Sequence, residues 1–148
     1  EYHLVISKIP EKINQTESFK EVSIKDSTIF FKKADFEVRI GWGTPPVEIS
    51  KNKYLILLHG IDKRMRCYRV FACLFDKNLN LLGLTKYYIM QPKETYEIYG
   101  DRPWVIFPCG MEKLDDKILI SYGAADSFIG IGEVDLSEIL SEMDKVKL

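Results

Sequence analysis

The sequence has few cysteines and few histidines. Its three cysteines, Cys67, Cys73 and Cys109, form an odd set without a C-x-x-C spacing, which argues against a disulfide framework and against a zinc knuckle. The two histidines, His3 and His59, leave a thin pool of metal ligands. We therefore expect buried free thiols in a reducing compartment, with no bound metal and no cofactor.

Long apolar runs and an excess of one charge are also missing. The longest uncharged apolar stretch, residues 54–58, has the length of a strand and falls far short of the ~18 residues that cross a bilayer. The net charge of −1 gives no long-range attraction to nucleic acid or to an anionic membrane. The sequence contains no recognisable signal peptide, Walker loop, G-x-G-x-x-G segment or nucleophile elbow. We therefore expect a cytoplasmic protein that binds neither nucleic acid nor a membrane.

What is present is the pattern of an all-β protein. Hydrophobic residues make up 46% and charged residues 29% of the 148 positions, which is typical of one folded domain. Short segments rich in Val, Ile, Tyr and Phe alternate with turn-forming clusters and predict strands. These strands are residues 2–6, 28–32, 54–59, 68–75, 87–89, 104–107, 118–122 and 129–134. One helix is predicted over residues 137–146, with Asp135 or Ser137 as its cap and a single apolar stripe.

The chain also repeats itself with a period of 63 residues. Pro45 and Pro108 stand 63 positions apart, and so do Gly60 and Gly123, each pair in a strand–turn–strand unit. This period suits a four-stranded β-propeller blade, and such blades stack radially because one blade cannot bury both of its faces. The predicted strands fill little more than two blades. Either further blades or an association of copies is then required, and a β-sandwich is the structural alternative.

Five segments resemble, in the same order, the motifs of one enzyme family. They are residues 41–47 (GWGTPPV), 54–60 (YLILLHG), 68–72 (YRVFA), 101–110 (DRPWVIFPCG) and 122–126 (YGAAD). The corresponding patterns are Gly-x-Gly-Thr/Pro-Pro-Pro, Tyr-His-Gly, Tyr-Arg-x-x-Ala, Asp-x-Pro-Asn-Val-Val-Phe-Pro-Cys-Gly and Tyr-Gly-Ala-Ala-Asp. They are motifs of glycoside hydrolase family 130, the β-mannoside phosphorylases and hydrolases. The resemblance covers residues 39–140, whereas residues 1–35 match only loosely.

The resemblance implies a particular fold and a particular gap. The family fold is a single five-bladed β-propeller of roughly twice this length. Residues 1–148 are then one partial domain, the C-terminal two to three blades with a short C-terminal helix, and the N-terminal blades are absent. The family's general acid is an aspartate on those blades, as are arginines that help to bind phosphate. We assign no catalytic residue to this chain, so whether it is an enzyme in isolation stays open.

Arg39 and His59 are the candidate phosphate-binding residues. Phosphate needs several cationic or N–H donors to hold its oxygens. The family's phosphorylases usually carry a lysine just before the Gly-x-Gly motif, where this chain has Arg39, and a histidine at the position of His59. From the residues alone, Arg39 is a surface charge beside a strand and His59 a structural histidine.

Asp126, Asp101, Tyr68 and Phe107 are the candidate substrate-binding residues. Carboxylates accept hydrogen bonds from sugar hydroxyls, and aromatic rings cover the apolar face of a sugar. The resemblance implies that Asp126 holds the sugar beside the scissile bond and places Tyr68 and Phe107 in the pocket wall. Without it, Asp126 is a turn-forming aspartate and the two rings belong to the core.

These expectations combine into one leading hypothesis. In the intact protein, β-linked mannosyl oligosaccharides are cleaved by inverting phosphorolysis to mannose 1-phosphate, with inorganic phosphate as co-substrate. The alternatives are a phosphate-independent β-mannoside hydrolase, and a non-catalytic sugar-binding or structural propeller fragment. In the structural case, copies of the chain would form a homo-oligomer that completes the propeller.

Overall fold

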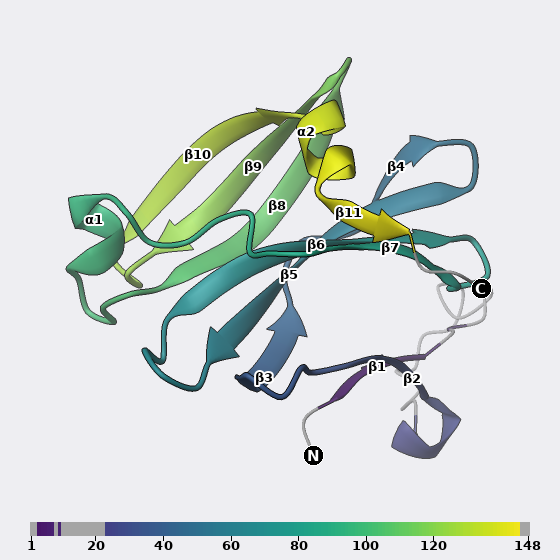
Figure 1. Cartoon of the computed structure of the whole chain (residues 1–148), viewed down its shortest axis with the longest axis horizontal. Coiled ribbons are helices and arrows are strands. Elements are labelled where there is room, and N and C mark those ends of the chain that lie inside the picture. Colours follow the sequence, from purple (N-terminus) through teal and green to yellow (C-terminus); the bar gives the residue numbers. More distant parts are fainter. Residues whose placement is uncertain (1–2, 8, 10–22, 146–148) are drawn as a thin grey trace, which may run out of the picture.

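The computed structural model describes residues 3–7, 9 and 23–145, and this part of the chain is mostly β-sheet with few helices (Figure 1). Its strands form three sheets. The smallest pairs β1 (His3–Ile6) with β2 (Thr28–Lys32), and a one-turn 3₁₀ helix, Ile24–Asp26, precedes β2. Among the described residues, no helix is long and apolar enough to cross a membrane.

The central sheet is built around the long hairpin of β5 (Lys53–Asp62) and β6 (Tyr68–Asp76). On the β5 side lie two short strands, β3 (Glu37–Trp42) and β4 (Val47–Ser50), which pair with opposite ends of β5. On the β6 side lies β7 (Leu81–Thr85). The last strand, β11 (Met143–Lys145), pairs with β7 and closes that edge.

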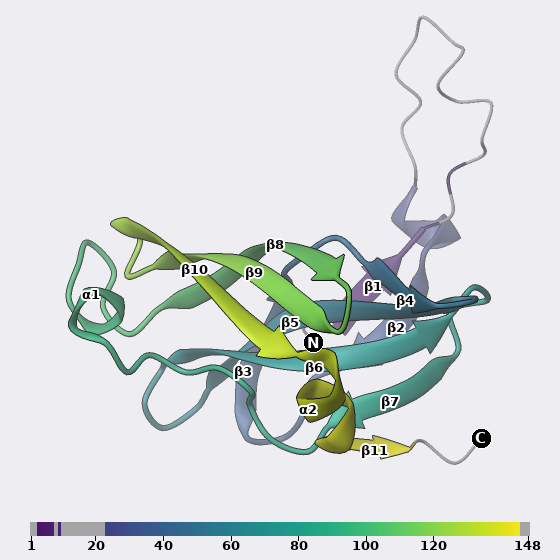
Figure 2. The ribbon, with the colours of Figure 1, turned by 90° about the horizontal axis from the view of Figure 1, so that it is seen from above.

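The third sheet has the order β10–β9–β8 and contains β8 (Ile106–Leu114), β9 (Lys117–Ala124) and β10 (Phe128–Asp135). Helix α1 (Thr95–Ile98) precedes β8, and helix α2 (Leu136–Ser141) leads from β10 back to β11 (Figure 2). The end of the chain therefore ties the third sheet to the outer edge of the central one.

The 63-residue repeat corresponds to a repeat of structure. Strands β5 and β9 occupy equivalent places, each followed by a returning strand. Ahead of β5, the partner strand is split into β3 and β4 by residues 43–46, where glycine and proline interrupt the ladder. Ahead of β9, the single strand β8 carries only a bulge between Pro108 and Gly110. The two units thus differ mainly in how their first strand accommodates the Pro position.

The core contains two layers on opposite faces of the central sheet and a smaller cluster of Ile61, Tyr68 and Val105, against which Phe107 packs. Alternation along β5 sends Leu55 and Leu57 toward the third sheet, where they pack with Ile118 and Ile120. The intervening side chains, such as Leu58, pack on the other face against the β1–β2 side of the molecule. Because β5 is buried on both faces, it shows a continuous apolar run instead of an alternation.

Several sequence-based expectations about the elements were wrong. Residues 87–89 form no strand; the amide of Ile89 donates to the Val70 carbonyl, and the next residue, Met90, forms an isolated bridge with Val70. Trp104 lies in a turn before β8. The C-terminal helix ends at Ser141 and not at residue 146, and Met143 lies in β11. Strands β3, β4 and β7 and helix α1 were not predicted, and Tyr2 and Val146 lie outside the described residues.

The expectation of buried thiols holds for two of the three cysteines. Cys67 and Cys73 are buried and free, and burial raises the pKa of the Cys73 thiol to about 12. Cys109 is also free but exposed, because it is the extra residue in the bulge of β8. A bulge residue has no partner on the neighbouring strand to cover it.

Candidate functional site

Four of the six predicted site residues meet in one cluster, which we call the Tyr68 cluster: Arg39, His59, Tyr68 and Phe107. The ring of His59 stacks on the ring of Tyr68, with 5.6 Å between the two ring centres. The ring centre of Phe107 lies 4.5 Å from that of His59. Arg39 Nη2 donates a hydrogen bond of 2.9 Å to the Tyr68 hydroxyl. The members come from β3, β5, β6 and β8, so the cluster joins the central and third sheets.

His59 reaches this position because its strand partner is a glycine. Gly41 pairs with His59 across β3 and β5. A Cβ atom on Gly41 would lie 2.3 Å from His59 Cε1 and 2.4 Å from Nε2, closer than real contacts allow. None of the glycines has a positive φ. Gly41 instead provides close approach.

Burial determines the charge of His59. The side chain is only 6% exposed. Desolvation lowers the pKa of His59 to about 4, with the nearby Arg39 charge acting in the same direction and a backbone hydrogen bond to Trp42 opposing both. At neutral pH His59 is therefore uncharged. Its buried Nδ1 has no hydrogen-bond partner among the described residues. His59 is thus suited to serve as a neutral hydrogen-bonding group, while Arg39 carries the positive charge.

Arg102 is a fifth member of the neighbourhood that sequence reasoning missed. Its guanidinium carbon lies 5.3 Å from the centre of the Tyr68 ring, and that of Arg39 lies 6.0 Å from the same centre. Both are within cation–π range. Arg102 directly follows Asp101 in a motif that resembles the family's. Nothing in the sequence, however, indicated that its side chain lies beside Tyr68.

Asp101 and Asp126 lie on two segments that are hydrogen-bonded together. The amide of Asp101 donates to Ser127 Oγ at 2.8 Å, and the amide of Arg102 donates to the Ala125 carbonyl at 3.0 Å. Ala125 and Asp126 both have left-handed φ values, 47° and 52°, which make the tight turn between β9 and β10. Both carboxylate residues are exposed.

Gly100 permits this contact between the two segments. A Cβ atom on Gly100 would lie 2.6 Å from the Ala125 carbonyl oxygen and 2.7 Å from Ser127 Oγ. The residue before Asp101 therefore has to be small for the loop to reach the turn. The same loop contains Trp104, whose φ of 61° is rare for a bulky residue and marks local strain.

Two buried polar side chains, Glu97 and Tyr122, support this loop through hydrogen bonds; we call this pair the brace. Tyr122 donates a 2.8 Å hydrogen bond to Glu97 Oε1, and Glu97 Oε2 accepts from the amides of Lys93 and Glu94. Burial, the largest single effect, favours a higher pKa, but these hydrogen bonds together hold the pKa of Glu97 below its usual value. The ionised Glu97 thus ties α1 to β9, next to the turn that carries Asp126.

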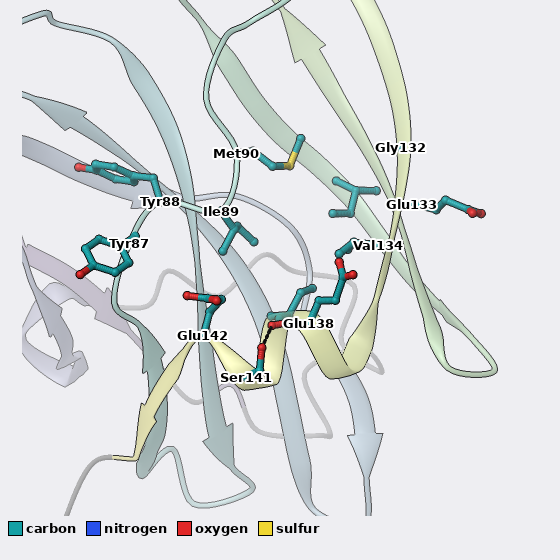
Figure 3. Close-up of a pocket in the computed structure, with 12 residues that line it drawn as sticks. Tyr87, Tyr88, Ile89, Met90, Gly132, Glu133, Val134, Glu138, Ser141 and Glu142 are labelled. Carbon is teal, nitrogen blue, oxygen red and sulfur yellow. Dashed lines mark hydrogen bonds between the residues drawn. The ribbon is translucent and has the colours of Figure 1, made fainter.

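Two cavities in the structure lie away from all six predicted residues. One, of about 620 Å³, lies between segment 87–90, β10 and α2, and is lined by Tyr87, Met90, Val134 and Glu138 among others (Figure 3). The other, of about 810 Å³, lies between β2, β7 and segment 86–93. Neither brings together the predicted phosphate-binding and sugar-binding groups. The predicted site residues therefore lie outside both cavities, with His59 and Tyr68 buried and Asp101 and Asp126 exposed.

The loop after His59, which carries Lys63, Arg64 and Arg66, stays exposed to solvent. The Asp62 carboxylate closes this loop by accepting hydrogen bonds from the backbone amides of Arg64 and Met65, at 3.1 and 2.7 Å. Asp62 also forms an ion pair of 3.3 Å with Arg69. These contacts give Asp62 a structural role in the loop.

Comparisons with known proteins agree on one family. A family model described as beta-1,4-mannooligosaccharide phosphorylase matches residues 1–145. A beta-1,2-mannobiose phosphorylase of Thermoanaerobacter sp. (strain X514) is 30% identical over 103 residues, which cover 68% of this chain and 33% of that protein. A beta-1,2-mannobiose phosphorylase of Listeria innocua is 33% identical over 108 residues, covering 72% and 30%.

Solved structures give the same result. The structure of the Listeria innocua beta-1,2-mannobiose phosphorylase in complex with beta-1,2-mannobiose aligns with a TM-score of 0.67 and 29% identity, covering 79% of this chain and 33% of that one. The chain therefore spans about one third of the length of the curated relatives it matches.

Proposed function

This chain belongs to glycoside hydrolase family 130, and from that premise we propose that the intact protein cleaves β-mannosides by phosphorolysis with inversion. An oxygen of inorganic phosphate bonds to the anomeric carbon of the mannosyl unit while the bond from that carbon to the bridging oxygen breaks. The departing oxygen takes a proton from a general acid. The products are mannose 1-phosphate and a shortened acceptor, so the reaction is also a transfer of a mannosyl group to phosphate.

The part of this site that the chain supplies binds and orients the reactants. In the proposal, Arg39 and neutral His59 hold phosphate oxygens, and Asp126 with Asp101 holds sugar hydroxyls. Tyr68 and Phe107 form the apolar wall between them. The meeting of Arg39, His59, Tyr68 and Phe107 in one cluster is the observation that carries this assignment. The general acid is expected on a part of the family fold that does not match this chain.

We also infer how the three sheets correspond to blades. The sheet β3–β7 with β11 and the sheet β8–β10 are two blades of a five-bladed propeller, and β1–β2 belongs to a preceding one. The burial of β5 on both faces supports this arrangement, because a central blade contacts a neighbour on each side.

Product analysis tests the proposed reaction. The full-length protein is incubated with β-1,2-mannobiose and with β-1,4-mannobiose, each with and without inorganic phosphate, and the products are identified by NMR. We expect mannose 1-phosphate to form only when phosphate is present. Free mannose released equally well without phosphate would show a hydrolase and refute phosphorolysis. The Arg64→Gln variant, altered in the exposed loop, is expected to match the unmodified protein.

A second candidate function follows from the share of the family fold that the chain covers. Because the chain spans one third of its relatives, a non-catalytic sugar-binding module is the alternative for the isolated 148 residues. Titration of β-mannobiose into the isolated chain distinguishes the two cases. Binding without turnover would support the module, and no binding would remove this role.

A further inference from the structure

Arg102 has a position that its family motif does not explain. The motif of residues 101–110 leaves its second position variable, and this chain has arginine there. The Arg102 side chain lies against other residues instead of extending freely into solvent. Its guanidinium lies over the Tyr68 ring at 5.3 Å from the ring centre, and the guanidinium of Arg39 lies near the same ring.

Neither guanidinium forms an ion pair with a carboxylate of the described residues. Within residues 3–7, 9 and 23–145, the ion pairs join Arg69 to Asp62, Lys86 to Asp144 and Lys117 to Glu133. Arg39 and Arg102 have no carboxylate partner in that part of the chain. Two cations without a carboxylate partner within 6.0 Å of one ring centre raise the local positive potential, which favours a bound anion.

A further donor lies at the same place. The Tyr68 hydroxyl accepts its hydrogen bond from Arg39, so its own proton remains available to donate. The Tyr68 ring therefore has a hydroxyl donor and two guanidinium groups within 6.0 Å of its centre. N–H and O–H donors of this kind suit an anion with several oxygens.

We propose that Arg102 is a second guanidinium, beside Arg39, for a tetrahedral phosphate oxyanion bound at Tyr68. The proposal rests on the proposed phosphorolysis, and it adds a residue that the family motif does not assign. Guanidinium groups bind phosphate in a forked geometry, and two of them distribute the charge of a dianion better than one. The phosphate is either free or the ester group of a sugar 1-phosphate.

The backbone of Arg102 links this anion site to the sugar-binding turn. Its amide donates to the Ala125 carbonyl, the residue directly before Asp126. The amide of Tyr68 donates to the Trp104 carbonyl in the same loop, at 3.0 Å. The loop therefore holds the Arg102 side chain at the boundary between the phosphate and the sugar. In phosphorolysis the new bond forms at that boundary.

Anion titrations with full-length variants test the role of Arg102. Dissociation constants for inorganic phosphate, mannose 1-phosphate and sulfate are measured by calorimetry at constant ionic strength for the unmodified protein, Arg102→Gln, Arg102→Lys, Arg39→Gln and the matched control Arg64→Gln. We expect Arg102→Gln to weaken phosphate binding about tenfold or more, because charge-assisted hydrogen bonds are lost. Arg102→Lys is expected to recover part of the affinity and Arg64→Gln to change nothing.

The titrations distinguish free phosphate from a sugar 1-phosphate as the ligand, and they distinguish failure of the Arg102 inference from failure of the proposed phosphorolysis. A larger loss for mannose 1-phosphate than for free phosphate would place Arg102 on the ester, and equal losses would place it on the phosphate group common to both. If Arg39→Gln weakens binding but Arg102→Gln behaves like Arg64→Gln, the inference is wrong and phosphorolysis survives. If the unmodified protein binds neither phosphate nor mannose 1-phosphate, phosphorolysis fails together with the inference. Melting temperatures without ligand, expected to be equal, separate lost binding from lost structure.

Discussion

His59 illustrates how packing, and not residue type, determines the chemistry of this site. A histidine beside an arginine in a phosphate-binding motif suggests a pair of cations. Burial against Gly41, Tyr68 and Phe107 instead leaves the imidazole uncharged, with its pKa lowered to about 4. The positive charge for an anion then comes from arginines, whose guanidinium groups stay charged at any physiological pH.

The lowered pKa of His59 predicts a pH-dependent stability. The unfolded chain binds a proton at His59 below pH 6.5 and the folded protein only below about pH 4, so stability falls as the pH drops through this window. Between pH 7.5 and 5 we expect this residue to cost about 2 kcal/mol. Urea unfolding of the unmodified protein and of His59→Gln at both pH values measures it. Both proteins keep His3, so the smaller pH slope expected for His59→Gln reports His59 alone; equal slopes would contradict a lowered pKa.

At the residue scale, motif matching found the six candidate positions but not their neighbours. Tyr68 and Phe107 were expected as pocket walls and do contact His59, since the motifs fix the strand ends that carry them. Whether they bind sugar stays a prediction. Arg102 and Glu97 were missed because each acts across a tertiary contact, to Tyr68 and to Tyr122, that leaves no pattern along the sequence.

At the scale of elements, α1 holds the loop that carries Asp101 in place. It has only four residues and is too short to be stable by itself. The hydrogen bond from Tyr122 on β9 to Glu97 anchors it, and Tyr96 contacts the same Tyr122 hydroxyl at 3.1 Å. The loop that follows α1 then packs on the turn of residues 124–127.

A pair of matched substitutions tests this brace. Tyr122→Phe removes the buried donor to ionised Glu97, and we expect a loss of about 1.5–3 kcal/mol in the free energy of unfolding. Tyr96→Phe removes a partly exposed hydroxyl and is expected to cost less than about 1 kcal/mol. Chemical unfolding measures both values. Hydrogen exchange should speed up at the amides of Asp101 and Arg102 in Tyr122→Phe only, and equal effects in the two variants would refute the brace.

The errors among elements have identifiable causes. Strands β3 and β4 escaped prediction because Gly43 and Pro45 break one strand into two short pieces. The C-terminal helix was predicted too long because its apolar spacing continues to Met143, whereas pairing with β7 draws residues 143–145 into a strand. Tertiary pairing of this kind overrides local propensity. The long hairpins β5–β6 and β9–β10 were predictable because β-branched residues and turn clusters mark them clearly.

At the scale of the whole molecule, the third sheet presents an uncovered face. Ile129 is 85% exposed and Ile131 is 72% exposed, and they lie on the face of β10 that points away from the Ile118–Ile120 core. Within the described residues no strand pairs with the outer edge of β10. An apolar face next to an open edge favours association with another chain.

We therefore predict that the isolated 148-residue chain self-associates through this face. Sedimentation velocity should show oligomers that increase with concentration. The double variant Ile129→Lys with Ile131→Lys is expected to be largely monomeric, because two charges would have to be buried in the contact. Ile24→Lys, at an isoleucine that is 77% exposed outside the sheets, is the matched control and should associate like the unmodified chain. A monomer at all concentrations would contradict the prediction.

We propose that phosphate and a mannosyl unit bind side by side at the Tyr68 cluster and the Asp101–Asp126 pair. A crystal structure of the full-length protein with phosphate and mannose, grown without sulfate, is the decisive test. We expect tetrahedral density within hydrogen-bond distance of the Arg39 and Arg102 guanidinium groups, and sugar hydroxyls on Asp126 and Asp101. Phosphate bound elsewhere, with these arginines and carboxylates facing solvent, would contradict it.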